Sequence, residues 1–186
     1  LSGKGDTSQK LTLMKTSADS LKKSADALND SSLWEKKKIK KKDEKTGEEI
    51  EVEDYDWDKI TKAVKSFVED YNDVVKEAGE SNTKDVLRNA SWMTGMTDKN
   101  SNMLAKIGIT IGKGNKLELD EDALRQADIS SLKTIFTGYN SFVSKISQKA
   151  TGISNAANRA SATYTNNGTY SKTDSSLTSS KIDKEV

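Results

Sequence analysis

The stretch from Trp57 to Ala78 constrains the fold of this chain more than any other part of the sequence. Its apolar residues recur every three or four positions, the spacing that places side chains on one face of an α-helix. Gly79 follows directly, and glycine commonly ends helices. The stretch therefore predicts a long amphipathic helix that needs neighbouring helices to cover one face. The residues of this face are Ile60, Val64, Phe67, Val68, Tyr71, Val74, Val75 and Ala78.

The composition limits how such helices can pack. Only 33% of the residues are hydrophobic, 32% are charged, and the chain of 186 residues contains no proline. A thick globular core needs more apolar surface than this, whereas long helices that each bury a narrow stripe do not. We therefore predict a mainly α fold, an elongated antiparallel helical bundle or coiled-coil stem with two small β-hairpins.

The N-terminal part, residues 1–33, is predicted to form a stem helix. Its apolar residues keep helical spacing from Leu13 to Leu28, and Asp6 followed by Gln9 indicates a capping box at the helix start. The sequence begins with Leu1 rather than Met, which leaves open a region upstream and the possibility that the chain is a fragment of a longer protein.

Residues 34–56 contain a lysine-rich run, which is a common cue for nucleic-acid binding. Acidic residues follow it after a turn at Gly47, and the net charge of the chain is only +1. A charged β-hairpin accounts for both runs, so we expect no nucleic-acid partner. In the predicted register Lys38 faces Glu53, Lys40 faces Glu51, Lys42 faces Glu49, Ile39 meets Val52 and Lys41 meets Ile50.

A second hairpin is predicted within the helical stem of residues 57–164, over residues 107–119. Apolar residues alternate on both sides of a turn at 112–115, and Asp120 can cap the helix that follows. The glycines of this stretch are expected to form the turn rather than bind phosphate. The structural motif comprises Ile107, Gly108, Ile109, Leu117, Leu119, Asp120 and Leu124.

The last predicted helix carries an apolar stripe that thins to alanine toward its end. Small residues allow close approach of a neighbouring helix but release little hydrophobic free energy, so this end should depend on a partner. We predict a partner or oligomer interface there, and a flexible or partner-dependent tail over residues 165–186. The interface residues are Phe142, Ile146, Ala150, Ile153, Ala157, Ala160 and Tyr164.

Chemical function finds little support in the sequence. Histidine and cysteine are absent, which removes the commonest general base, the thiol nucleophile and most zinc sites. Asp98, Asn100 and Asn102 open like a calcium loop, but Met103 and Ile109 stand where its glycine and its bidentate glutamate belong. We therefore expect no enzyme, no cofactor and no metal. No apolar run is long enough to insert in a membrane, and a signal peptide is not evident.

Several segments occur in an order that resembles the C-terminal region of the flagellar filament-capping (hook-associated protein 2) family. They begin with Phe67-Val68-Glu-Asp-Tyr71-Asn72 and continue with Leu-x-x-Ile-Gly-Ile at Leu104 to Ile109. A Gly/Asn turn at 112–115, Leu-x-Leu-Asp-Glu-x-x-Leu at 117–124 and Phe136 complete the set. The resemblance covers about Trp57 to Tyr164. Two departures are the absence of β-rich middle lobes and a tail rich in serine and threonine.

The resemblance implies a structural protein of the bacterial flagellum, secreted and extracellular. Proteins of this family cap the growing filament as oligomers and assist flagellin subunits. The expected partners are thus flagellin-like subunits and further copies of the chain, joined by coiled-coil association. The alternative is a secreted or surface binding module for adhesion that uses the charged hairpin. The oligomer count, the flagellin-contacting surface and any export chaperone do not follow from the sequence.

Overall fold

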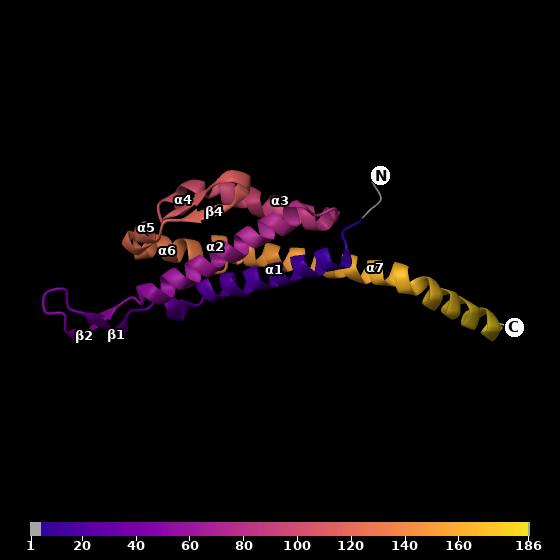
Figure 1. Cartoon of the computed structure of the whole chain (residues 1–186), viewed down its shortest axis with the longest axis horizontal. Helices are drawn as coiled ribbons and strands as arrows, with labels where there is room; N and C mark the ends of the chain where they lie inside the picture. Colours follow the sequence, from indigo (N-terminus) through magenta and orange to yellow (C-terminus); the bar gives the residue numbers. More distant parts are fainter. Residues whose placement is uncertain (1–4, 186) are drawn as a thin grey trace.

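A computed structural model describes the backbone of residues 5–185 and the side chains of residues 5–163. The molecule is elongated and mainly helical, and two small antiparallel hairpins interrupt the helices, as predicted (Figure 1). Three long helices run along its length: α1 (Ser8–Leu28), α2 (Trp57–Gly79) and α7 (Phe142–Glu185). α1 runs antiparallel to the other two.

The buried residues of α1 are spaced alternately by three and four positions. The buried aliphatic residues of α7 opposite them follow the same alternation. This is the heptad spacing of helices that pack along a continuous seam, and it is compatible with a coiled-coil stem. The residues of the two stripes are Leu11, Met14, Ala18, Leu21, Ala25 and Leu28 in α1, and Ile146, Ala150, Ile153 and Ala157 in α7.

A second layer lies on one side of the long helices (Figure 1). α3 packs against α7, where Gly152 leaves room for the neighbouring helix: a Cβ atom built on it would lie 2.4 Å from Oδ1 of Asn89. The layer consists of α3 (Lys84–Lys99), α4 (Ser101–Ala105), β3 (Ile109–Ile111), β4 (Leu117–Leu119), α5 (Glu121–Gln126) and α6 (Ile129–Phe136).

Aromatic side chains join the two layers. Phe67 of α2 is fully buried, and its ring lies 6.3 Å from that of Phe136 and 6.4 Å from that of Phe142, edge to face in both pairs. Trp34 stacks on the other side of the cluster at 5.7 Å from Phe136 and donates its indole N–H to the carbonyl of Leu28. These contacts place residues of α2, α6 and α7 in a single core.

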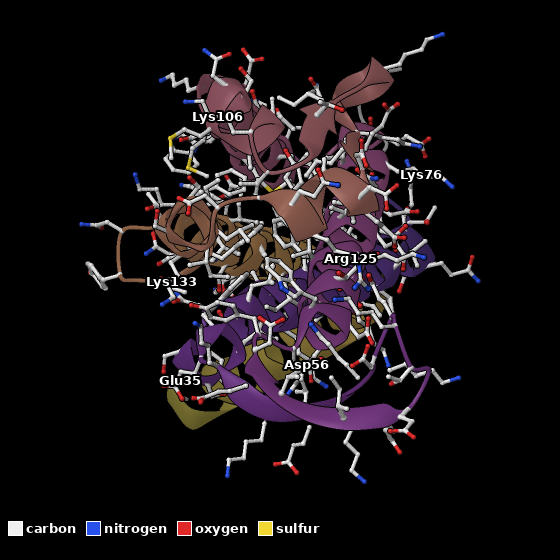
Figure 2. All side chains as sticks on the ribbon, turned by 90° about the vertical axis from the view of Figure 1, so that its left-hand side faces the viewer. Glu35, Asp56, Lys76, Lys106, Arg125 and Lys133 are labelled. Atoms are coloured by element: carbon white, nitrogen blue, oxygen red, sulfur yellow. The ribbon has the colours of Figure 1, made fainter. Side chains whose placement is uncertain are left out.

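The charged hairpin projects from one end of the molecule (Figure 1). β1 (Lys37–Lys42) and β2 (Glu49–Asp54) pair antiparallel in the predicted register, with Lys38 opposite Glu53, Lys40 opposite Glu51 and Lys42 opposite Glu49. Figure 2, which looks at this end, shows side chains of the hairpin pointing away from the helices into solvent. The predicted pairing is confirmed, and the run of lysines is matched by glutamates across the ladder.

Leu13, at which the predicted apolar stripe of the first helix begins, is 48% exposed because the stripe of α1 passes through Leu11 and Met14 instead. The backbone of α7 continues as a helix through the predicted tail to Glu185. Whether that tail is flexible or needs a partner stays a prediction, because the side chains beyond residue 163 lie outside the described residues.

Candidate functional surfaces

The central hairpin is shorter than the predicted range of residues 107–119. Its strands pair Ile109 with Leu119 and Ile111 with Leu117, and a tight turn joins them at Lys113–Asn115. Ile107 precedes the first strand and is fully buried in the core. The prediction of a hairpin with a turn at the glycines is thus confirmed, and its first strand begins two residues later than expected.

Gly108 closes the base of this hairpin. Its φ of +90° lies in the left-handed region, which side chains of L-residues disfavour. Its carbonyl accepts a 2.8 Å hydrogen bond from the amide of Asp120, and a Cβ atom on Gly108 would lie 2.7 Å from the carbonyl oxygen of Asp120. Only glycine fits here, because the end of β4 and the start of α5 approach so closely.

Asp120 caps α5 as predicted. Its side chain accepts a 3.1 Å hydrogen bond from the amide of Ala123, and Glu121 and Asp122 follow in the first turn, where the helix dipole favours acidic residues. Leu124 is fully buried beneath the cap. Leu119 is only half-buried, although it lies in the same motif, because it is the last residue of the edge of a two-stranded sheet.

Two asparagines that the sequence did not single out as a pair hold distant backbone segments. The side chain of Asn72 donates to the carbonyl of Leu117 at 2.9 Å and accepts from its amide at 2.7 Å. Asn29 binds the amide and the carbonyl of Gly138 in the same two-sided way. Asn72 thereby fixes β4 to α2, and Asn29 fixes the loop before α7 to the end of α1.

The predicted C-terminal interface is largely used within the chain itself. Phe142, Ile146, Ala150, Ile153 and Ala157 are buried against other helices of the same chain. Within the chain these five residues thus pack on its own helices, and an intermolecular interface at this stripe stays a prediction. Ala160 is partly buried at the edge of the core, and the side chain of Tyr164 lies outside the described residues.

A repeated polar contact sets the register of α1 against α7. The hydroxyl of Ser154 donates to Asp19 at 2.5 Å, and one heptad away that of Ser147 donates to Asp26 at 2.6 Å. Burial opposes ionisation of both carboxylates. Hydrogen bonds from these serines and from Lys15 and Lys22 outweigh that effect, so the pKa of each aspartate lies below its ordinary value. Sliding α7 along α1 would break both contacts.

Asp6 does not form the predicted capping box. Thr7 caps α1, accepting from the amide of Lys10, while the buried Asp6 carboxylate turns to the loop before α3. There it accepts hydrogen bonds from the hydroxyls of Ser81 and Thr83 and from the amide of Asn82. Burial raises the pKa of Asp6, but these donors outweigh it and hold the pKa below its ordinary value. Asp6 thus pins the start of α1 to the loop between α2 and α3.

The described residues offer no arrangement that resembles a metal centre. Among them, no three acidic side chains are grouped so that they could hold an ion. A shallow groove between α2 and α5 is lined by Lys65, Glu69 and the acidic start of α5, with Lys65 lying 3.8 Å from Glu121. Within the described chain, none of the helices is long and apolar enough to cross a membrane.

Comparison with known protein families identifies the chain. No curated protein and no solved structure gave a significant match. The family profile described as flagellar hook-associated protein 2 C-terminus matches residues 79–185, from the end of α2 to the last described residue of α7. The match covers more than half of the chain and includes the central hairpin, the Asp120 cap and the whole of α7. The chain therefore belongs to the flagellar hook-associated protein 2 family, whose members form the filament cap.

Proposed function

We propose that this chain acts in assembly of the flagellar filament by joining neighbouring subunits through the part of α7 that extends beyond its own bundle. The observation that carries the proposal is the length of α7 relative to α1. The contacts of Asp19 with Ser154 and of Asp26 with Ser147 set an antiparallel register. In that register Ser8, the first residue of α1, lies opposite Thr165.

Beyond Thr165 the helix continues to Glu185 without α1 beside it (Figure 1). At a rise of 1.5 Å per residue this extension is about 30 Å long. An isolated helix of that length is marginal in water, because helix formation without tertiary packing gains little free energy. Association with helices of other copies, or of flagellin-like subunits, would supply the missing packing. The expected location is extracellular, at the tip of the filament, and the role is structural rather than catalytic.

Introducing charge into the extension tests this proposal. Leu177 and Ile182 are aliphatic residues of the extension, and replacing both with Asp should abolish concentration-dependent association because buried charge opposes helix packing. Analytical ultracentrifugation of the full chain measures the change. The matched control replaces Ser175 and Ser180 with Asp, which adds the same charge at polar positions and should leave association within about two-fold.

Electron microscopy of gold-labelled protein with flagellin filaments tests the location. The unsubstituted chain and the serine control should decorate one end of each filament, and the Leu177→Asp, Ile182→Asp variant should not. A chain that stays monomeric at all concentrations and decorates no filament end would refute the assembly role. Decoration along the whole filament would also refute it.

The charged hairpin supports adhesion as a second candidate function. It projects from the end of the bundle, and its lysines are exposed except where Lys37 is partly covered. A two-stranded sheet leaves both outer edges free to pair, and an unpaired edge can accept a strand of a partner protein. The exposed basic strand and acidic strand would then select the partner.

Charge reversal distinguishes two roles of the hairpin charges: pairing of the two strands and binding of a partner in adhesion. Replacing Lys38, Lys40 and Lys42 with Glu places like charges opposite each other and should cost about 0.2–1 kcal/mol for each pair. Hydrogen exchange of the strand amides measures that loss. A second variant also replaces Glu49, Glu51 and Glu53 with Lys, which restores the pairing with its polarity inverted. Adhesion through the hairpin predicts loss of binding to host-cell surfaces in both variants, whereas normal binding by the second variant excludes it.

A further inference from the structure

A hollow on the outer face of the α3–α7 contact is distinct from the surfaces described above. Trp92, Gly95, Met96 and Lys99 line it from α3, spaced as one face of a helix, and Asn100 and Lys145 complete it. Trp92 is 46% exposed, although tryptophan carries more apolar surface than any other side chain here. The hollow therefore keeps a large aromatic surface in contact with water.

Gly95 shapes the floor of this hollow. It lies in the interior of α3, where glycine destabilises a helix relative to alanine, and a Cβ atom built on it would meet no other atom within 4 Å. Neither backbone conformation nor close packing therefore requires glycine at this position. Its effect is to leave a gap between the side chains of Trp92 and Lys99, where a side chain of another molecule can fit.

The charge around the hollow is of one sign. The ammonium group of Lys149 lies 4.1 Å above the centre of the Trp92 ring, so the ring holds the lysine at the rim. Lys99 and Lys145 line the hollow itself, and no carboxylate does. Within the part of the chain whose side chains are described, no ion pair neutralises these three lysines. An aromatic floor with an unneutralised basic rim is complementary to an apolar side chain flanked by carboxylates.

We propose that this hollow, which we term the Trp92 groove, docks an acidic amphipathic segment of a partner protein. An apolar residue of the segment would lie on Trp92 above Gly95, and its carboxylates would pair with Lys99, Lys145 and Lys149. Exposed tryptophan is among the residue types that most often dominate the energy of protein interfaces. With a net charge of +1, the chain has no broad positive field to favour a membrane or nucleic acid instead.

The test uses the full chain and synthetic peptides of about 14 residues, or about four helical turns. One peptide carries leucine and glutamate at amphipathic spacing, and two others replace each glutamate with glutamine or with lysine. Fluorescence anisotropy of labelled peptides measures binding. The glutamate peptide should bind, more weakly as salt increases, and the glutamine peptide should bind at least ten-fold more weakly.

Two variants of the chain locate the binding. Gly95→Leu places a side chain in the gap, its Cβ position having no other atom within 4 Å, and should weaken binding of the glutamate peptide at least ten-fold. The matched control is Gly79→Leu, since Gly79 also has open space around its Cβ position but lies at the end of α2. Circular dichroism should show that both variants keep the helical content of the unsubstituted chain.

Reversing the charge gives a readout that misfolding cannot produce. The Lys99→Glu, Lys145→Glu variant should lose the glutamate peptide and gain the lysine peptide. Its control is Lys62→Glu, Lys76→Glu, which likewise changes one lysine in the last turn of a helix and one near a helix start. Lys76 is labelled in Figure 2. The control should bind the glutamate peptide as the unsubstituted chain does.

Three results would overturn the proposal. Equal binding of the glutamate and glutamine peptides would show that the lysines do not select the partner. Binding to vesicles of anionic phosphatidylglycerol, lost in Gly95→Leu while no peptide binds, would assign the groove to a membrane surface. Self-association lost in Gly95→Leu, again with no peptide binding, would assign it to a second copy of the chain. The proposal does not depend on the assembly role of α7, because none of these variants changes the α7 extension.

Discussion

Replacing Phe67 with Ala is expected to lower the free energy of unfolding by about 3–5 kcal/mol. Phe67 has no exposed surface, and its ring contacts those of Tyr71, Phe136 and Phe142. Truncation removes buried apolar area and leaves a cavity where α2, α6 and α7 meet. The surrounding rings come from three helices, so they cannot all move inward to fill the space.

Urea unfolding followed by circular dichroism measures this loss. The control is Tyr139→Ala, which removes an aromatic ring that is 84% exposed and should change stability by less than about 0.5 kcal/mol. Phe67→Leu should recover much of the lost stability, because it refills most of the volume with apolar atoms. If Phe67→Ala is no more destabilising than Tyr139→Ala, the aromatic cluster does not join the two layers as described.

The fold class and the two hairpins follow from patterns that are local in sequence. Helical spacing in α2 depends on residues three and four positions apart, and the hairpin register depends on a short turn at Gly47. The pairing of Lys40 with Glu51 was predictable because any shift by one residue would move the side chains to opposite faces. Such signals need no knowledge of how distant segments meet.

The contacts that fix one layer on the other could not be predicted in this way. Asn72 binds Leu117, which is 45 positions away, and Asn29 binds Gly138, which is 109 positions away. An asparagine side chain carries a donor and an acceptor whichever segment it meets, so its sequence neighbours do not reveal its partner. For Asp6 a local pattern predicted a contact that the structure does not contain. A suitable local pattern predicted a capping box, while a loop 75 positions away supplied better donors.

The C-terminal stripe shows the same limit for function. Heptad spacing at Ile146, Ala150 and Ile153 indicates that a helix covers this face, but spacing does not state whether that helix belongs to the same chain. In the structure the covering helix is α1 of the same chain, and it covers α7 only as far as Ser8, where α1 begins. Spacing likewise does not decide whether Trp92 of α3 lies in the core or at the surface, because Gly95 follows it within the same helix. In the structure the side chain of Trp92 is 46% exposed.

Replacing Gly108 with Ala is expected to destabilise the chain by about 2–5 kcal/mol, the combined cost of a strained backbone and overpacking. At φ +90° the new Cβ atom would disfavour the required conformation, and it would also lie 2.7 Å from the carbonyl oxygen of Asp120 and 3.0 Å from the amide nitrogen of Leu124. Both neighbours are backbone atoms of the α5 cap, so they cannot rotate away as a flexible side chain could. Relief requires separating the hairpin base from α5.

Gly114→Ala separates the two contributions to this cost. Gly114 also has a positive φ, +69°, but a Cβ atom on it would meet nothing within 4 Å. That variant should lose only the strain contribution, about 1–2 kcal/mol. Urea unfolding compares the two, and hydrogen exchange at the amide of Asp120, which donates to the carbonyl of Gly108, locates the damage. Faster exchange there in Gly108→Ala alone is expected, because the clash opens the hairpin base. Equal losses of stability in the two variants would mean that α5 moves away from the new Cβ atom with no loss of unfolding free energy. The close approach of Asp120 to Gly108 would then not hold the hairpin in place.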